Sequence, residues 1–439
     1  MKQEALIENY YSNAEFSEVH AMNEKQNTID RRNFLKTVGA AGLSSVLAST
    51  GAIAGPNQSN AEDKPKYPQV PKRKLGKTGI EVPSLSLGAN RLIDSQILLR
   101  AALRWGVNYW DTAPSYTGGN CELTIGKFIS KNPDVRKKLF IVSKATGART
   151  VADVEERLQT SLKRMNTGYI DLYYGVHGLS SPSRLTNEMK EWVRSAKKRG
   201  LIRFFGFSTH KNIDQNLVAA AKLGWIDAIM TAYNFRLMQD SKIQAAIETC
   251  HKAGLGLIAM KTVALDVQQR GRIEKGEKIE TEDDKKLLSH FLEQGLAVEH
   301  AKIKFVLEDK RFSSACVGMN NVTNLKSNVE AALDKTKLTQ ADREALAEYA
   351  QATCSSYCTA CAHICNSALP HAPYVSNIMR YLMYHNSYGE QAEARRLFAQ
   401  IPTGVRNKLL DMDYTLAEAR CPQRLPIREL ITEAVSVLT

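Results

Sequence analysis

Four of the chain's eight cysteines lie within twelve residues, in the run CSSYCTACAHIC. The spacing from Cys354 to Cys365 is C-x3-C-x2-C-x3-C, and a Cys-Pro pair follows far downstream at Cys421. Disulfides between such close neighbours would close small, strained rings, and structural zinc usually takes two separated pairs of ligands. A cubane iron–sulfur cluster takes thiolates from a compact run, often with one from a distant Cys-Pro. The residues therefore favour a 4Fe-4S cluster, with zinc and disulfides as the alternatives.

A second group of residues is suited to the reduction of a carbonyl. Asp111, Tyr116, Lys144 and His177 lie at or just after the ends of three successive apolar runs. Hydride addition leaves negative charge on the carbonyl oxygen, so a proton must be supplied there. A tyrosine hydroxyl, with an ordinary pKa of about 10, donates poorly at neutral pH unless a nearby ammonium lowers that pKa.

These four residues have distinct expected roles. We predict that Tyr116 donates the proton, that Lys144 lowers the pKa of Tyr116, that Asp111 keeps Lys144 charged, and that His177 orients the carbonyl. Taken singly, each has an ordinary alternative as a turn cap, a rim aromatic, a buried lysine stem or a hydrogen-bonded core histidine. The prediction depends on their occurrence together at consecutive strand ends.

Eight short apolar runs, rich in Val, Ile, Phe and Tyr, alternate with segments of helical period. The runs span residues 82–90, 107–113, 139–145, 170–178, 204–209, 228–234, 256–261 and 314–319. This alternation predicts a parallel (β/α)8 TIM barrel, an α/β fold whose chemistry lies at the carboxyl ends of the strands. An open doubly wound sheet is the weaker alternative, because no G-x-G-x-x-G follows the first strand. The segment RKLGKTGIEVPSL predicts a hairpin that plugs the barrel floor, and the charged insert at 266–286 predicts a mobile loop.

Five motifs, LGKTGIEVPSLSLG, WDTAPSY, IVSKA, DLYYGVHG and FFGFSTH, resemble the aldo-keto reductases in order and spacing over roughly residues 72–335. The family's Asp, Tyr, Lys and His match Asp111, Tyr116, Lys144 and His177. The resemblance implies a nicotinamide cofactor, usually NADP, lying across the barrel mouth, and a small carbonyl or alcohol substrate. It also implies cofactor contacts from a serine on the fifth strand and from the segment after the eighth: Ser208, Gly318, Met319, Asn320 and Asn328.

Three departures from the family pattern lie near the expected cofactor. Thr209 replaces the usual Asn, and Met230 replaces the usual Gln on the sixth strand. The Ser-Pro-Leu pattern of the seventh strand reads MKTVAL, which places Lys261 where it can reach an anion. These changes leave open the choice between NADP and NAD.

The barrel pattern stops after residue 336, and LTQADREALAEYA predicts a helix that leads to Cys354. The sequence YCTACAHICN, with ARCPQRLPI downstream, resembles the ferredoxin-like tail of some aldo-keto reductases, with one cysteine run instead of two. This resemblance implies a mainly helical C-terminal domain with one 4Fe-4S cluster. Its expected ligands are Cys358, Cys361 and Cys365, with Cys421 favoured over Cys354 as the fourth because a proline follows it. The cysteines of the barrel, Cys121, Cys250 and Cys316, are expected to be small buried residues.

Near the N-terminus, Arg31 and Arg32 precede Phe34-Leu35-Lys36 and a stretch rich in Ala, Gly and Ser, which together resemble a twin-arginine export signal. The stretch is too short and small-residued for a stable membrane anchor. A basic start to a buried helix is the alternative, and Met22 is a second candidate start. The resemblance implies export of the folded protein by the twin-arginine machinery to the periplasm, a route that suits an inserted cluster. We therefore expect a signal and linker at 1–61, the barrel at 62–335 and the iron–sulfur domain at 336–439.

The formal net charge is +13, with 43% hydrophobic and 24% charged residues, which is ordinary for a globular protein with affinity for anions. No basic run is interleaved with aromatic residues, so nucleic-acid binding is not expected. Two functions remain. The first is an exported oxidoreductase whose cluster is an electron relay, with an electron-transfer partner, or a structural element. The alternative is a redox-carrier or binding protein whose barrel does not turn over.

Overall fold

The computed structural model of this chain describes residues 67–267, 273–274, 277–278, 281–370 and 374–439. The chain divides into two compact units, residues 1–64 with 271–281, and residues 65–270 with 282–439. In the first unit, β10 (Ile273–Glu274) and β11 (Glu277–Lys278) form an antiparallel pair. The predicted export signal lies outside the described residues. Within those described ranges, no helix has the length and apolar character needed to span a membrane.

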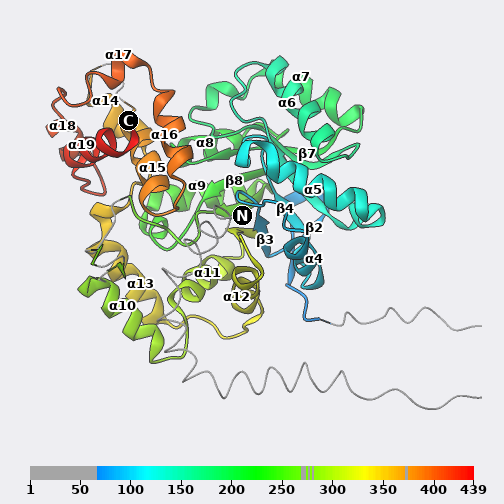
Figure 1. Cartoon of the computed structure of the whole chain (residues 1–439), viewed down its shortest axis with the longest axis horizontal. Helices are drawn as coiled ribbons and strands as arrows, with labels where there is room; N and C mark the ends of the chain where they lie inside the picture. Colours follow the sequence, from blue (N-terminus) through cyan, green and yellow to red (C-terminus); the bar gives the residue numbers. More distant parts are fainter. Residues whose placement is uncertain (1–66, 268–272, 275–276, 279–280, 371–373) are drawn as a thin grey trace, which may run out of the picture. The chain divides into compact units, whose positions relative to one another are not determined.

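Eight parallel strands of the second unit close into a barrel in the order β12-β3-β4-β5-β6-β7-β8-β9 (Figure 1). They are β3 (Leu85–Gly88), β4 (Tyr109–Asp111), β5 (Phe140–Lys144), β6 (Ile170–Val176), β7 (Ile202–Thr209), β8 (Ala228–Ala232), β9 (Gly256–Met260) and β12 (Ser314–Gly318). Closure occurs where β12 pairs with β3, with Ala315 opposite Leu85 and Gly318 opposite Gly88. The predicted TIM barrel is confirmed, and each of the eight apolar runs overlaps one strand of the barrel. The runs are apolar because such strands are buried on both faces.

A short hairpin closes the amino-terminal end of the barrel, as predicted. β1 (Lys72–Lys74) pairs antiparallel with β2 (Glu81–Pro83), and Leu75 and Val82 pack into the cluster that fills the barrel interior. Gly76 has a φ of +50°, and a Cβ there would lie 2.4 Å from the carbonyl oxygen of Gly254. Only glycine therefore allows the hairpin to approach the start of β9 this closely.

Helices follow the strands along the chain. They are α4 (Gln96–Arg104), α5 (Asn120–Lys131), α6 (Val151–Arg164), α7 (Asn187–Lys198), α8 (Ile213–Ala221), α9 (Ser241–Lys252), α10 (Glu282–Leu292), α11 (Val298–Glu308) and α12 (Val322–Leu333). At the start of α6, Thr150 and Asp153 form a capping box that satisfies free backbone N–H groups. The prediction of a loop over 266–286 is wrong for its C-terminal part, because α10 begins at Glu282. Three acidic residues in its first turn favour a helix start there.

The C-terminal region is mainly helical, as predicted. It contains α13 (Gln340–Ala352), α14 (Ala362–Ser367), α15 (Val375–Asn386), α16 (Gln391–Ala399), α17 (Thr403–Arg406), α18 (Thr415–Arg420) and α19 (Ile427–Leu438). Helix α15 contacts α14, α16 and α19, and Ile378, Leu382 and Leu430 are fully buried among them. In Figure 1 the helices from α14 onward, orange to red, gather into one group. We call residues 353–439 the tail.

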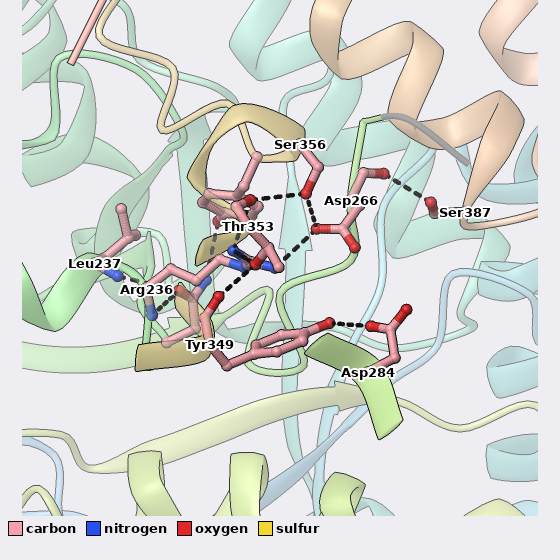
Figure 2. Close-up of polar contacts among 10 residues, drawn as sticks. Arg236, Leu237, Asp266, Asp284, Tyr349, Thr353, Ser356 and Ser387 are labelled. Atoms are coloured by element: carbon pink, nitrogen blue, oxygen red, sulfur yellow. Dashed lines mark hydrogen bonds and ion pairs between the residues drawn. The ribbon is translucent and has the colours of Figure 1, made fainter. Parts of the chain in front are cut away.

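The tail is joined to the barrel by a buried polar network (Figure 2). Arg236, which follows β8, donates to the Thr353 hydroxyl at 2.8 Å and forms an ion pair with Asp266 at 2.9 Å. The same Asp266 oxygen accepts from the Ser356 hydroxyl at 2.9 Å, and the Asp266 carbonyl accepts from Ser387 at 2.7 Å. The Arg236 side chain is only 2% exposed, so its charge depends on this pair. The tail is therefore attached to the barrel by buried polar contacts as well as by the continuous chain.

Candidate active site and cysteine cavity

Lys144 and Asp111 form a buried ion pair at the carboxyl end of the barrel strands. Lys144 ends β5, Asp111 ends β4, and the two strands are neighbours in the barrel. The Lys144 Nζ lies 2.5 Å from Asp111 Oδ1 and donates to the Thr112 carbonyl at 2.8 Å. The second carboxylate oxygen of Asp111 is buried, and no described residue donates a hydrogen bond to it. Burial raises the pKa of Asp111, while the Lys144 ammonium opposes that rise.

Tyr116 and His177 complete the group that the sequence singled out. Tyr116 begins the short 3-10 turn η2 (Tyr116–Gly119), and the Lys144 Nζ lies 4.9 Å from the centre of its ring. The His177 ring stands nearly perpendicular to the Tyr116 ring, with centroids 6.5 Å apart. The His177 Nδ1 is hydrogen-bonded to the Thr146 hydroxyl at 2.8 Å. The structure therefore brings all four predicted residues together.

The ionisation of Tyr116 and His177 follows from their burial. Burial, with Lys144 nearby, lowers the pKa of His177 to about 3, so its imidazole is neutral at neutral pH. The pKa of Tyr116 is raised well above its ordinary value, by burial first and then by Asp111. The expected lowering of the Tyr116 pKa by Lys144 is therefore wrong for this conformation. The physical reason is burial of the hydroxyl, which disfavours the phenolate, with the Asp111 carboxylate as the next largest cause.

The tail covers the mouth of the barrel beside these residues. The Lys261 Nζ lies 4.8 Å from the centre of the Tyr384 ring and 4.2 Å from that of Tyr388. Glu390 accepts a hydrogen bond from Asn90 at 2.7 Å and lies 3.4 Å from Arg91, just after β3. Tyr384 and Glu390 are also among the groups that raise the Tyr116 pKa.

Sequence reasoning missed these tail residues. The only signal is the spacing of Arg380, Tyr384 and Tyr388, four residues apart, which favours one face of a helix. Nothing in that spacing says which surface the face covers, because α15 lies far along the chain from the barrel strands it meets.

The predicted cofactor residues lie at the mouth, in two environments. Gly318 ends β12 and is exposed, Asn320 is also exposed, and Asn328 lies inside α12, which begins after the cap residue Asn321. Met319, by contrast, is buried in the core. Because α12 presents free N–H groups at its start, this segment fits a phosphate group.

The nicotinamide end of the expected site is enclosed. Ser208 is fully buried, and its hydroxyl accepts from the Gly178 N–H at 3.1 Å. Thr209 donates to the Leu179 carbonyl at 2.8 Å, and Met230 fills the barrel interior. The residues thus fit the phosphate end of a nicotinamide nucleotide, whereas its ring would have to share the mouth with Tyr384 and Tyr388.

Four cysteines of the tail line one small cavity. Cys358, Cys361, Cys365 and Cys421 surround it together with apolar residues that include Val375 and Met379. Cys354, the alternative fourth ligand, lies in the short turn η6 (Cys354–Ser356) and does not line it. All eight cysteines are free of disulfide bonds. The structure thus brings together the set of four that the sequence favoured.

The four cysteines form a thiol-only donor set, the kind that holds a 4Fe-4S cubane by one thiolate on each iron. Among the described residues, no group of three or more His, Cys, Asp or Glu side chains is arranged to hold a metal ion. The open volume is about 20 Å³, roughly one water-sized sphere, so the thiols would have to turn outward around a cluster. Burial raises the pKa of Cys358 to about 12 and that of Cys365 to about 11, so loading would release protons.

A large cavity lies at the opposite end of the barrel. Its volume is about 1030 Å³, and it is lined by residues of the floor hairpin and of α11, with many basic side chains among them. None of the four predicted catalytic residues or the tail cysteines lines it. Its position at the amino-terminal end sets it apart from the end where such barrels carry out chemistry.

Comparison with known proteins supports this assignment of the barrel. Residues 85–350 match the model of the Aldo/keto reductase family. The chain is 24% identical over 296 residues to L-galactose dehydrogenase of Arabidopsis thaliana, covering 63% of this chain and 92% of that protein. It is also 24% identical over 305 residues to the uncharacterized oxidoreductase YqkF of Bacillus subtilis, covering 63% and 95%.

Solved structures agree on the fold. The aldo-keto reductase AKR11C1 of Bacillus halodurans, in its holo form, superimposes with a TM-score of 0.52 at 24% identity, covering 64% of this chain and 96% of that one. The thermostable aldo-keto reductase Tm1743, solved with the inhibitor epalrestat, gives a TM-score of 0.50 at 25% identity, covering 63% and 99%. The family match extends over more than half of the sequence and includes the strand ends that carry Asp111, Lys144 and His177. The chain therefore belongs to the aldo/keto reductase family and is an NAD(P)-dependent oxidoreductase.

Proposed function

We propose that this protein is an exported oxidoreductase that transfers a hydride between a nicotinamide cofactor, NADP or NAD, and a carbonyl or alcohol substrate. The observation that carries the proposal is the buried Lys144–Asp111 pair beneath the Tyr116 ring, with a neutral His177 beside it. In the barrels of this fold, chemistry takes place at the strand ends where this group lies.

The bound nicotinamide would supply or accept the hydride, and the chain's own residues would manage the proton. Tyr116 is protonated at neutral pH and would donate its proton to the carbonyl oxygen. Lys144 would stabilise the negative charge that remains, and Asp111 holds the Lys144 ammonium in place. A neutral His177, fixed by Thr146, has one nitrogen left to orient the substrate oxygen.

The test is turnover by the purified protein. A panel of aldehydes, ketones and quinones is offered with NADPH or NADH, and nicotinamide absorbance is followed. Oxidation of the nucleotide that depends on both the carbonyl and Tyr116 is the expected result. Nucleotide oxidation that is unchanged in Tyr116→Phe would show that electrons reach the substrate elsewhere.

The tail cysteines are proposed to hold one 4Fe-4S cluster, as an electron relay or as a structural element. The support is that Cys358, Cys361, Cys365 and Cys421 line one cavity with apolar walls. When bound, such a cluster supplies one-electron chemistry. The loop residue Ala360 lies next to this cavity, and its carbonyl accepts from the Asn212 N–H, four residues after Ser208. The cysteine loop is thus joined to the segment that follows β7 by a backbone hydrogen bond.

Export through the twin-arginine route is proposed from the sequence of the first 61 residues. Replacing both Arg31 and Arg32 with lysine keeps the charge and removes the twin arginines. The protein should then stay in the cytoplasm with its leader uncut, as judged by fractionation and immunoblotting. Periplasmic delivery of the double variant at the wild-type level would contradict the proposal.

The alternative is a redox carrier whose barrel does not turn over. The observation that favours it is the cover over the mouth, where Tyr384 and Tyr388 lie against Lys261. A carrier should contain the cluster but bind no nucleotide and reduce no carbonyl. Nucleotide content of the purified protein, measured after denaturation, separates the two functions most directly.

A further inference from the structure

Three cationic side chains, Lys211, Lys261 and Arg380, lie close together where the tail meets the barrel mouth. Lys211 follows β7, Lys261 follows β9, and Arg380 lies on α15. The strands β7 and β9 both flank β8, so their carboxyl ends open onto the same part of the mouth. We call these three residues the mouth cation cluster.

The charges of this cluster influence one another. Burial lowers the pKa of Lys211 to about 8, and Arg380 is the next largest cause. His210, beside Lys211 in the chain, has a pKa well below its usual range, because of burial first and then Arg380 and Lys261. The Gly178 N–H, next to His177 in the chain, donates to Ser208, three residues before Lys211, so the mouth cation cluster lies near the site of chemistry.

No carboxylate in the described part of the chain lies within ion-pair distance of the cluster, although Glu390 is among the groups that raise the Lys261 pKa. Lys211 donates to the amide oxygen of Asn377, and Lys261 faces the rings of Tyr384 and Tyr388. The Nε of Arg380 is buried, and no group in the described residues accepts a hydrogen bond from it. The carboxylate of Glu390, also from the tail, is instead engaged by Asn90 and Arg91.

Such an arrangement is unfavourable unless an anion completes it. The three side chains are half-buried, so their charges are partly shielded from water, and the buried, unmet donor of Arg380 adds to the cost. Guanidinium groups match carboxylates and phosphates especially well, because they donate two parallel hydrogen bonds. The mutually repelling charges of Lys211, Lys261 and Arg380 would be relieved by one such anion.

We propose that the mouth cation cluster binds a carboxylate or phosphate group of the molecule that reacts at Tyr116, with Arg380 as its main ligand. This rests on the proposed oxidoreductase function and adds that the substrate is an anionic carbonyl or alcohol compound. It gives the tail a second task, because Arg380 is a specificity-determining residue that the barrel itself lacks. The same chemistry has a second source in the phosphates of the nicotinamide cofactor.

The first experiment uses inorganic phosphate as the probe and needs no turnover. Thermal unfolding of the full chain is followed at rising phosphate, at constant ionic strength set with chloride. Wild type should be stabilised, Arg380→Gln should lose most of that stabilisation, and Arg380→Lys should keep part of it. Arg420→Gln, an exposed charge removal in the same tail, should behave like wild type. Equal stabilisation of all four proteins would overturn the proposal.

A wild type that phosphate does not stabilise would also overturn it. If Arg380→Gln does not fold, Lys211→Gln provides a second test of phosphate binding, because it removes a charge of the mouth cation cluster without changing α15.

The second experiment distinguishes the two sources of the anion. Carbonyl substrates with and without a carboxylate, otherwise of the same shape, are compared by kcat/KM, and NADP binding is measured by tryptophan fluorescence. If the substrate carries the anion, Arg380→Gln should lose about 10–100-fold of the preference for the carboxylate and leave NADP affinity unchanged. If Arg380→Gln instead binds NADP more weakly and keeps the preference for the carboxylate substrate, the anion belongs to the cofactor. A protein that binds phosphate through Arg380 but reduces no carbonyl would support the anion site. The same result would contradict only the proposed oxidoreductase function.

Discussion

The Lys144 ammonium lies 4.9 Å from the centre of the Tyr116 ring. An ammonium in this position stabilises the tyrosine side chain through the negative face of the ring and favours the ionised hydroxyl. Burial acts in the opposite direction and is the largest influence on the Tyr116 pKa. With the tail over the mouth, Tyr116 stays fully protonated, as a proton donor must be before it reacts.

Tyr116→Phe keeps the ring over Lys144 and removes only the hydroxyl. If Tyr116 is the proton donor, carbonyl reduction should fall by about 10²–10⁴-fold in kcat, while the affinity for nucleotide changes little. Steady-state kinetics and fluorescence titration measure the two quantities. Leu123→Ala, at an exposed position on α5, is a matched control and should leave both unchanged.

Lys144→Met should impair the same step as Tyr116→Phe. The two changes combined should then cost scarcely more than either alone, because residues that act as a unit are not additive. Additive losses would indicate that Lys144 acts on catalysis independently of the tyrosine. Since Lys144→Met leaves Asp111 buried without its partner, the melting temperature of each variant is measured first, and Asp111→Asn/Lys144→Met provides a pair without the stranded charge.

The barrel was predictable because each element carries its own signal. Strands buried on both faces read as apolar runs, and the floor hairpin is marked by Gly76, where no other residue fits. The strand-end residues followed, since parallel strands bring their carboxyl ends together whatever the loops do. Asp111, Lys144 and His177 were placed correctly for that reason.

The cover over the mouth was not predictable from the same signals. Tyr384 contacts Lys261 across more than a hundred residues of sequence, and nothing local to either residue specifies the other. The high pKa of Tyr116 depends on this long-range burial, which explains why its direction was predicted wrongly. Arg236 shows the same limit, since its buried charge is explained only by Asp266 and the tail.

The neutral state of His177 predicts a dependence of stability on pH. Its pKa is about 3 in the folded protein against an ordinary 6.5, so the unfolded chain binds the extra proton between these values. Stability due to this group is therefore present above pH 6.5 and is lost as the pH falls toward 3. Between pH 7 and pH 5 the loss should be about 1–2 kcal/mol, allowing for the part of the ring that still meets solvent.

Urea unfolding of wild type and His177→Gln at several pH values isolates this contribution from that of the carboxylates. The difference in unfolding free energy between the two proteins should shrink as the pH is lowered from 7 to 5. A constant difference would mean that His177 is solvated in the folded protein and that the mouth is open.

The cysteine cavity predicts a brown protein with about four irons per chain after anaerobic purification. Cys358→Ser or Cys361→Ser should remove the colour. Cys421→Ser should remove it more completely than Cys354→Ser, because Cys421 lines the cavity and Cys354 does not. Iron analysis and visible absorbance measure the loss, and Cys250→Ser, buried beside α8, is the control. Stoichiometric zinc without iron would contradict the cluster, and bleaching by Cys354→Ser alone would reassign the fourth ligand.

The last prediction concerns the ion pair that joins the tail to the barrel. Arg236→Met leaves the Asp266 carboxylate facing Thr353 and Ser356 without a positive charge, in a site where the arginine is only 2% exposed. Removing one partner of such a buried pair should lower the free energy of unfolding by about 3–5 kcal/mol. Asp266→Asn strands the Arg236 charge instead and should cost about as much, and the double variant should be more stable than either single variant. If the network also holds the tail over the mouth, limited proteolysis of Arg236→Met should release a tail fragment while the barrel stays folded. Equal protease resistance of wild type and Arg236→Met, together with a cost below about 1 kcal/mol, would place the attachment of the tail in its hydrophobic contacts instead.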